Sequence, residues 1–252
     1  MRKSFLSVSV AVLLAGVQVG CGDDEGVGSG DNTIYEPAGN SPAPVLIWGN
    51  ATGSPVRTYR TLHQYFADNG YLVVAANDTS TGQGESLIQA LNWIERENSR
   101  QGSRYYGKAD LSRVAISGHS QGGASAVVAA GKDSRIKALA ALQPDCAFWV
   151  RCNNSDEIKA TSLLVAGGSD SLVSSRVVEG VYRDIRQSPA VYAEIRRMSH
   201  TGWYRDQEDD MGKQILTFFD GVLNNDSAKL GQFESGRCDV CGSSWDIKSK
   251  NF

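Results

Sequence analysis

The sequence lacks the charge patterns that mark nucleic-acid binding or disorder. Its 252 residues carry a net charge of only −3, and 21% are charged while 41% are hydrophobic, which is an ordinary globular composition. It has neither a basic stripe nor an acidic tail, so neither a nucleic-acid partner nor a solvating, disordered role is expected. It also has no internal repeat and no second core, and its length suits one domain of good size.

A hydrophobic run long enough to span a membrane comfortably is missing as well. The apolar stretch "FLSVSVAVLLAGV" follows Arg2 and Lys3 and is too short, but it has the form of an export signal. The ending "QVGC" resembles the lipobox of bacterial lipoproteins, in which the cysteine is lipidated. We therefore expect a signal peptide over residues 1–20, membrane attachment through a lipidated Cys21 and a flexible Gly-rich tether over residues 21–33. The alternative to this cell-envelope location is an ordinary signal peptide that is cleaved nearby and releases an extracellular protein.

Cysteine is scarce, with five residues in the chain. Without Cys21 four remain, and an even number outside the cytoplasm favours disulfides. Of the three possible pairings, proximity along the chain favours Cys146–Cys152 and Cys238–Cys241. A redox role for Cys238-Asp-Val-Cys241 is the alternative, although no strand–helix context surrounds it. One such pair without a second is a weak zinc signal, and we expect neither a metal nor a cofactor.

Apolar strands alternate with helical patterns over residues 34–252. Such strands are too apolar to face water, so we expect one α/β domain with a mostly parallel sheet and helices on both faces. Ligands of such sheets bind beyond the carboxyl ends of the strands. The expected strands are 43–50, 71–77, 112–120, 136–144, 161–170 and 191–200, and the expected helices are 57–70, 85–98, 121–131, 174–187 and 210–225.

The segment "VAISGHSQGG" places a serine between glycines where an apolar strand meets a helix. This arrangement is typical of a nucleophile elbow, in which a sharp turn exposes the serine hydroxyl above the sheet. Gly118 and Gly122 give the turn space, and Gly123 allows the helix to pack closely. The helix also points the positive end of its dipole at the reaction centre. Ser120 is therefore the candidate nucleophile.

Histidine is rarer still, with three residues in the chain. A serine needs a base to take its proton, and the elbow fold supplies its triad in the order serine, acid, histidine. His63 lies upstream of Ser120 and is interpreted as a surface or packing residue, while His119 lies inside the elbow and is interpreted as a support residue. His200 follows the last strand in the loop "SHTGW", so it is the candidate base.

Two aspartates compete for the role of the acid that orients the histidine. Asp170 follows an apolar strand in "VAGGSDSLV", and Asp145 follows the preceding strand in "LQPDCAFW". Asp145 lies beside a disulfide candidate, which indicates a structural loop, so Asp170 is favoured. Asp78 also follows a strand, but it precedes Ser120 and is interpreted as a loop cap.

A serine hydrolase also needs two backbone N–H groups that form an oxyanion hole. One belongs to the residue after the nucleophile, here Gln121. The other comes from the loop after the strand "VLIWG", so it belongs to Asn50, or to Ala51 if the register shifts by one.

These motifs resemble those of the α/β-hydrolases. Within them the chain is similar to the secreted cutinase-like and polyester-hydrolase-like serine esterases, which are related in outline to the dienelactone-hydrolase group. The resemblance covers nearly the whole mature chain, through "PVLIWGNATG", "NGYLVVAANDTST", "SGHSQGG", "GGSDSLVS" and "MSHTGW". It implies an α/β-hydrolase fold and a metal-free ester hydrolase with Ser120, Asp170 and His200 as its triad. A small or polymeric ester is the expected substrate, and a monomer is the expected state.

The chain departs from these esterases around the expected substrate site. They usually carry Met at the position of Gln121, an aromatic residue at the position of Asn50 and a Pro-Trp after the sixth strand. Here that loop reads "QPDCAFW", with Trp149 displaced. These departures favour a general exported carboxylesterase over a polyester hydrolase. Ala51, Trp149 and Trp203 are the candidates to line the substrate cleft.

Two other functions compete with an esterase. The same triad can act on other acyl bonds, as in an amidase, a thioesterase or an acyltransferase, and fold alone does not choose among them. A surface lipoprotein that binds a ligand on an inactive hydrolase scaffold is the alternative from outside the enzymes. The presence of all three triad residue types in order argues against it.

Overall fold

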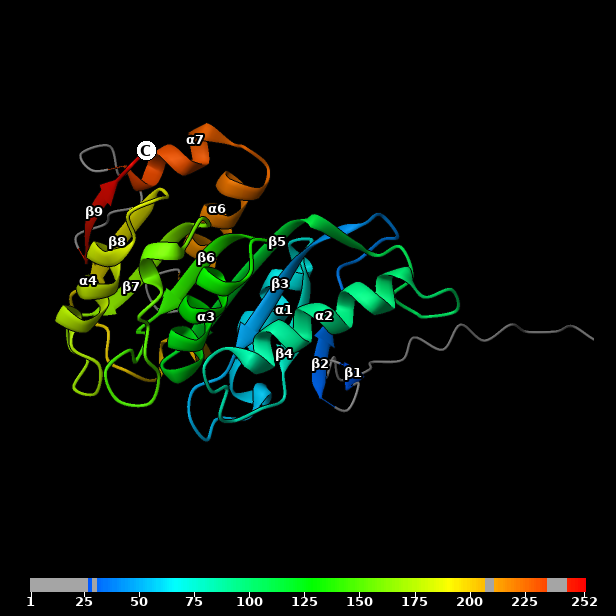
Figure 1. Ribbon diagram of the computed structural model, residues 1–252, viewed down its shortest axis with the longest axis horizontal. Helices are drawn as coiled ribbons and strands as arrows, with labels where there is room; N and C mark the ends of the chain where they lie inside the picture. Colours follow the sequence, from blue (N-terminus) through cyan, green and yellow to red (C-terminus); the bar gives the residue numbers. More distant parts are fainter. Residues whose placement is uncertain (1–26, 29–30, 207–210, 235–243) are drawn as a thin grey trace, which may run out of the picture.

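The computed structural model describes residues 27–28, 31–206, 211–234 and 244–252. These residues form one sheet of nine strands in the order β1-β2-β4-β3-β5-β6-β7-β8-β9 (Figure 1). The strands are β1 (Val27–Gly28), β2 (Asn32–Tyr35), β3 (Ala43–Gly49), β4 (Leu72–Ala76), β5 (Ala109–His119), β6 (Ile136–Leu142), β7 (Thr161–Gly167), β8 (Ala190–Ile195) and β9 (Trp245–Lys250).

The middle of the sheet is parallel. Neighbouring strands run parallel from β4 through β3, β5, β6 and β7 to β8. Their side chains are almost all buried, as strands covered on both faces require. This confirms the expectation of a mostly parallel sheet in an α/β-hydrolase fold.

Three antiparallel strands at the edges of the sheet were not expected. β1 pairs with β2, β2 pairs with β4, and β9 pairs with β8. β1 and the first residues of β2 fall inside residues 21–33, which were expected to be a tether, so the sheet begins earlier than residue 34. β1 and β2 are only two and four residues long, and β9 is half-exposed or exposed along most of its length, so their sequences lack the long apolar run that identified the central strands.

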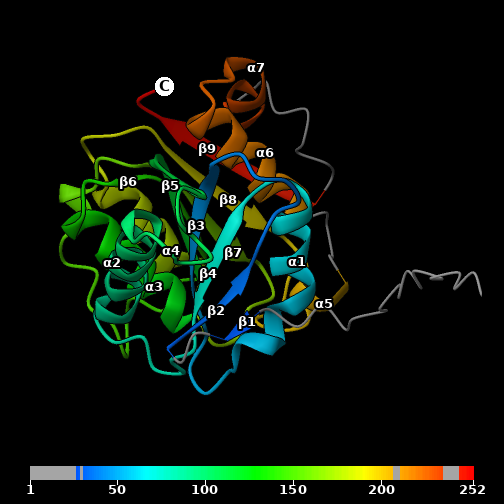
Figure 2. The ribbon, with the colours of Figure 1, turned by 90° about the vertical axis from the view of Figure 1, so that its right-hand side faces the viewer.

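Helices cover both faces of the sheet (Figure 2). One face carries α2 (Glu85–Ser99), α3 (Gln121–Lys132) and α4 (Ser175–Asp184), and the other carries α1 (Arg60–Asp68), α5 (Trp203–Asp206) and α6 (Met211–Leu223). Two cores result, one on each side of the sheet. The remaining short elements are η1 (Val56–Tyr59), η2 (Ser155–Glu157), α7 (Ser227–Leu230) and η4 (Gly231–Phe233). In the described ranges, no helix has both the length and the apolar character needed to cross a membrane.

A disulfide joins Cys146 to Cys152, the pairing that proximity favoured, and closes the loop after β6. The expected signal peptide, Cys21 and the Cys238–Cys241 pair lie outside the described residues.

Candidate active site

Ser120 lies at the turn between β5 and α3, at the carboxyl edge of the sheet. Its backbone has φ 54° and ψ −119°, a conformation that residues with side chains rarely adopt. The turn is tight, because a Cβ added to Gly118 would lie 2.4 Å from the carbonyl oxygen of Gly122. One added to Gly122 would lie 2.2 Å from the carbonyl oxygen of Gly49. The glycines therefore let β3, β5 and α3 meet at the serine, as an elbow requires.

The structure brings Ser120, His200 and Asp170 into one hydrogen-bonded series. The Oγ atom of Ser120 lies 3.0 Å from Nε2 of His200, and Nδ1 of His200 lies 2.7 Å from Oδ2 of Asp170. Along the chain, Asp170 precedes His200 by 30 residues and Ser120 precedes it by 80. Since Oδ2 of Asp170 is positioned to accept a hydrogen bond from the Nδ1–H group of His200, the Nε2 atom is left to accept the hydrogen of the serine hydroxyl.

The carboxylate of Asp170 is fully enclosed and uses both oxygens. Oδ1 accepts the backbone N–H groups of Leu172 and Val173 at 2.8 and 2.9 Å. Burial alone would raise the pKa of Asp170, but the hydrogen bonds from His200, Val173 and Leu172 outweigh it and hold that pKa below its usual value. Asp170 is thus a carboxylate near neutral pH, the form that orients an imidazole.

Gln143 is a member of this site that the sequence analysis missed. It directly follows β6, is fully buried and has a positive φ of 46°. Its Nε2 group donates to Oδ2 of Asp170 at 2.8 Å and to the carbonyl of Ser199 at 2.9 Å. Its Oε1 atom accepts the indole N–H of Trp203 at 2.9 Å. Gln143 therefore holds both the acid and the loop that carries His200.

His119 lies behind the catalytic histidine candidate. Its ring centroid is 4.8 Å from that of His200, and its Nδ1 atom is 2.8 Å from the hydroxyl of Tyr59. That hydroxyl accepts the backbone N–H of Ala51 at 3.3 Å, which leaves its own proton for Nδ1. Burial, followed by the charge of His200, lowers the pKa of His119 to about 3, so His119 stays neutral beside the base.

His63 takes no part in this site. It is fully buried against the rings of Tyr35, Trp48 and Tyr59. Neither ring nitrogen has a hydrogen-bond partner among the described residues, and burial lowers the pKa of His63 to about 3. It is a packing residue in the core rather than a surface residue.

The candidate oxyanion-hole donors are backbone N–H groups near the elbow. Gln121 is the first residue of α3, so its N–H has no acceptor within the helix. The side chain of Asn50 points away from the serine and donates to the carbonyls of Ala76 and Asp78 at 2.7 and 3.0 Å. The N–H of Ala51 is already used by Tyr59. This favours the backbone N–H of Asn50 over that of Ala51 as the second donor.

A cleft of about 550 Å³ opens over Ser120 and His200. Ala51 and Trp149 line it, as expected for substrate-binding candidates, and Asp145 also lies in its wall. Trp203 does not line the cleft: it is 1% exposed and packs against His119, with ring centroids 5.4 Å apart. The expectation that Trp203 lines the substrate cleft is therefore wrong, because its buried indole N–H donates to Oε1 of Gln143 instead.

Asp145, the rival acid, does not contact His200. Its Oδ1 atom accepts the backbone N–H groups of Ala147 and Phe148 at 3.4 and 3.2 Å, which bends the disulfide-closed loop. Its own N–H donates to the carbonyl of Ser120 at 3.1 Å. The geometry thus joins Asp170, rather than Asp145, to the histidine.

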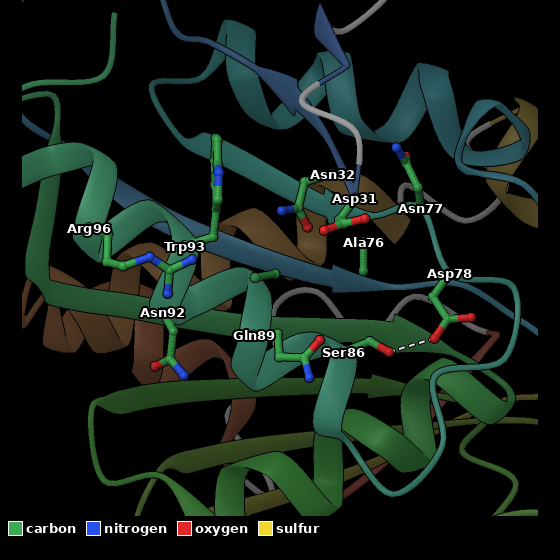
Figure 3. A pocket seen from close by; sticks show the side chains of 11 residues that line it. Asp31, Asn32, Ala76, Asn77, Asp78, Ser86, Gln89, Asn92, Trp93 and Arg96 are labelled. Carbon is green, nitrogen blue, oxygen red and sulfur yellow. Dashed lines mark hydrogen bonds between the residues drawn. The ribbon is translucent and has the colours of Figure 1, made fainter. Parts of the chain in front are cut away.

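A second cavity of similar volume lies between the end of β4, the start of β2 and α2, away from Ser120 and His200 (Figure 3). Its wall includes Asp78, which accepts the backbone N–H of Ser80 at 2.8 Å and the hydroxyl of Ser86 at 2.5 Å. Asp78 is thus the loop cap that the sequence indicated. Neither histidine nor cysteine is among the described residues that line this cavity. Across the described part of the chain, no cluster of three or more acidic, histidine or cysteine side chains is arranged to hold a metal ion.

Comparisons with known proteins point to one group. A family model named PETase and described as PET hydrolase-like matches residues 24–248. Cutinase est2 of Thermobifida alba is 26% identical over 181 residues, which cover 69% of this chain and 58% of the relative. Cutinase 1 of Thermobifida cellulosilytica is 29% identical over 152 residues, which cover 58% of this chain and 55% of the relative. A cutinase of Thermobifida fusca (strain YX) is also 29% identical, over 48% of its length. The chain thus spans about half the length of these relatives.

Proposed function

The chain belongs to the PET hydrolase-like family, and from this premise we propose that it is an exported serine hydrolase of carboxylic esters. The observation that carries the proposal is the series from Ser120 Oγ through His200 to Asp170, with distances of 3.0 and 2.7 Å, at the floor of an open cleft. A nucleophile, a base and an orienting acid are all that ester hydrolysis through an acyl-enzyme requires of side chains.

In the proposed reaction, Ser120 attacks the ester carbonyl while Nε2 of His200 takes its proton. Asp170 keeps the histidine in the required tautomer and stabilises its charged form. The imidazolium then protonates the departing alcohol, leaving an acyl group on Ser120. A water molecule repeats the attack with His200 as base, which releases the acid and restores the serine.

The negative oxygen formed in each attack would be bound by the backbone N–H groups of Gln121 and Asn50. Loss of one such donor typically costs about 2.7–4 kcal/mol of transition-state stabilisation. The close approach of Gly49 to Gly122 supports this assignment, because it brings the end of β3 against the start of α3.

The location and partners are part of the same proposal. The basic, apolar start of the chain supports export, and Cys21 supports attachment to a bacterial membrane by lipidation, with an extracellular protein as the alternative. The expected substrate is a small or polymeric ester, and the expected state is a monomer. The Cys238–Cys241 disulfide remains a proposal.

The family favours polyesters as one candidate substrate, and the relatives are named cutinases. The wall of the cleft, however, contains the charged side chain of Asp145, and Trp203 does not line it. Amides, thioesters and acyl transfer are further reactions that the same triad permits.

A fluorophosphonate probe tests the proposal directly, since it labels only an activated serine. We expect rapid labelling of the native protein and none of the Ser120→Ala variant. A folded native protein that resists labelling would favour the binding lipoprotein instead. A panel of p-nitrophenyl esters of increasing acyl length, beside a polyester film, then defines the substrate.

A further inference from the structure

The cleft wall contains a carboxylate that the proposed reaction does not use. Asp145 is 8% exposed and lines the same cleft as Ser120 and His200. Its Oδ1 atom accepts two backbone N–H groups of its own loop, at 3.2 and 3.4 Å. Within the described residues, Oδ2 accepts no hydrogen bond and no cationic side chain pairs with the carboxylate. Oδ2 is not among the enclosed, unpartnered polar atoms of the described residues, so it is open to the cleft, where a cationic group can reach it.

Two aromatic residues follow Asp145 on the same loop. Phe148 is 75% exposed and Trp149 is 68% exposed, and both line the cleft. The backbone N–H of Phe148 binds Asp145, so the ring and the carboxylate are held on one turn. The disulfide between Cys146 and Cys152 closes this turn and limits its movement.

A carboxylate and exposed aromatic rings in the wall of one cleft attract organic cations. The π faces of Trp and Phe attract quaternary ammonium groups, which cannot donate a hydrogen bond and bind through charge and contact. The anionic carboxylate adds a charge attraction that is strong in a partly enclosed site. A carboxylate-bearing substrate would be repelled by the same group.

We propose that Asp145, Phe148 and Trp149 form a subsite that selects esters carrying a quaternary ammonium group. The inference rests on the proposed esterase function and deepens it by naming a substrate class. Asp145 acts here as a substrate-binding residue and takes no part in proton transfer. The cation can belong to the alcohol or to the acyl part of the ester, and the test separates these two cases.

The test compares cationic esters with neutral isosteres. In one arm the alcohol is choline, and its isostere carries a tert-butyl group in place of the trimethylammonium group. In the other arm, p-nitrophenyl esters carry the same two groups at the end of the acyl chain. We expect kcat/KM of native protein to favour the cationic ester in at least one arm by about tenfold or more.

The Asp145→Asn variant keeps the shape of the side chain and removes its charge. It should reduce the ratio of kcat/KM between cationic and neutral esters by about tenfold. Asp156→Asn is the matched control, because it removes the same charge from an exposed site outside the cleft, and it should keep the native ratio. Phe148→Ala and Trp149→Ala, at exposed positions, should each lower the ratio.

A readout on native protein does not depend on how the variants fold. Tetramethylammonium should inhibit hydrolysis of the neutral ester competitively. Equal kcat/KM for the cationic and neutral esters in both arms would overturn the subsite, as would an Asp145→Asn variant with the native ratio. If instead neither ester is hydrolysed and the fluorophosphonate probe does not label Ser120, the esterase proposal itself fails.

Discussion

Replacing Asp170 with asparagine should lower kcat on the order of a thousandfold to ten-thousandfold, because it should place the proton of His200 on the wrong nitrogen. This factor corresponds to about 4–5.5 kcal/mol of transition-state stabilisation. The change removes one charge and almost no volume, so its effect measures the hydrogen-bond pattern around the acid.

Four donors surround the Asp170 carboxylate and decide how an asparagine would lie. Oδ1 faces the backbone N–H groups of Leu172 and Val173, which cannot rearrange. Oδ2 faces Nδ1 of His200 and Nε2 of Gln143. The amide oxygen should therefore remain on the backbone side, and the amide NH₂ should face the histidine.

Nδ1 of His200 can accept a hydrogen bond from this NH₂ group only if Nδ1 carries no proton. The proton then moves to Nε2, which faces Ser120 Oγ and can no longer accept its hydrogen. Gln143 cannot relieve the conflict by rotating its amide, because its Oε1 atom accepts the indole N–H of Trp203. The variant should thus fold and bind ester but fail to activate the serine.

Steady-state hydrolysis of a p-nitrophenyl ester and the rate of fluorophosphonate labelling should fall together, while the thermal midpoint confirms folding. Asp145→Asn is the matched change at the rival acid and should lower kcat on a neutral ester by less than about tenfold, since Asp145 does not touch His200. A folded Asp170→Asn variant that keeps more than about a tenth of native kcat would refute the tautomer argument. A severe loss in Asp145→Asn alone would reassign the acid.

Three further changes test the scaffold. His63→Phe should improve stability in acid. Burial lowers the pKa of His63 from 6.5 to about 3, so between these pH values the unfolded state binds a proton and the folded state does not. The native protein therefore loses stability as the pH falls below 6.5. The difference in unfolding free energy between pH 7 and pH 5, measured with urea, should shrink by about 2 kcal/mol, and an unchanged difference would contradict the burial argument. Gly118→Ala should cost more than about 3 kcal/mol and abolish labelling, because its Cβ would lie 2.4 Å from a backbone oxygen, and a stable, labelled variant would contradict the elbow geometry. Replacing both Cys146 and Cys152 with serine should cost about 2 kcal/mol. Reductant should then shift the native midpoint by more than that of the variant, which keeps Cys238 and Cys241, and equal shifts would contradict the role of this bond.

The central strands and the elbow could be predicted because their signals are local. A parallel strand covered on both faces must be apolar along its whole length, and β4 and β7 show such runs. The elbow needs glycines at fixed distances from Ser120, and these are adjacent in the sequence. The edge strands carry no comparable signal: β9 reads "WDIKSK" and becomes a strand only because β8 offers it a partner.

The supporting groups of the site could not be predicted for a related reason, which Gln143 illustrates. A glutamine after a strand reads as an ordinary loop residue, and its positive φ of 46° is not a glutamine preference. Its partners Asp170, Ser199 and Trp203 lie 27, 56 and 60 residues further along the chain. Only the folded sheet brings them together, because the carboxyl ends of β6, β7 and β8 are neighbours. Gln143 and Ser120 share one sequence signal, which is their position directly after a buried parallel strand. This signal identifies candidate site residues, but it does not tell a residue that faces the substrate from one that positions the catalytic groups.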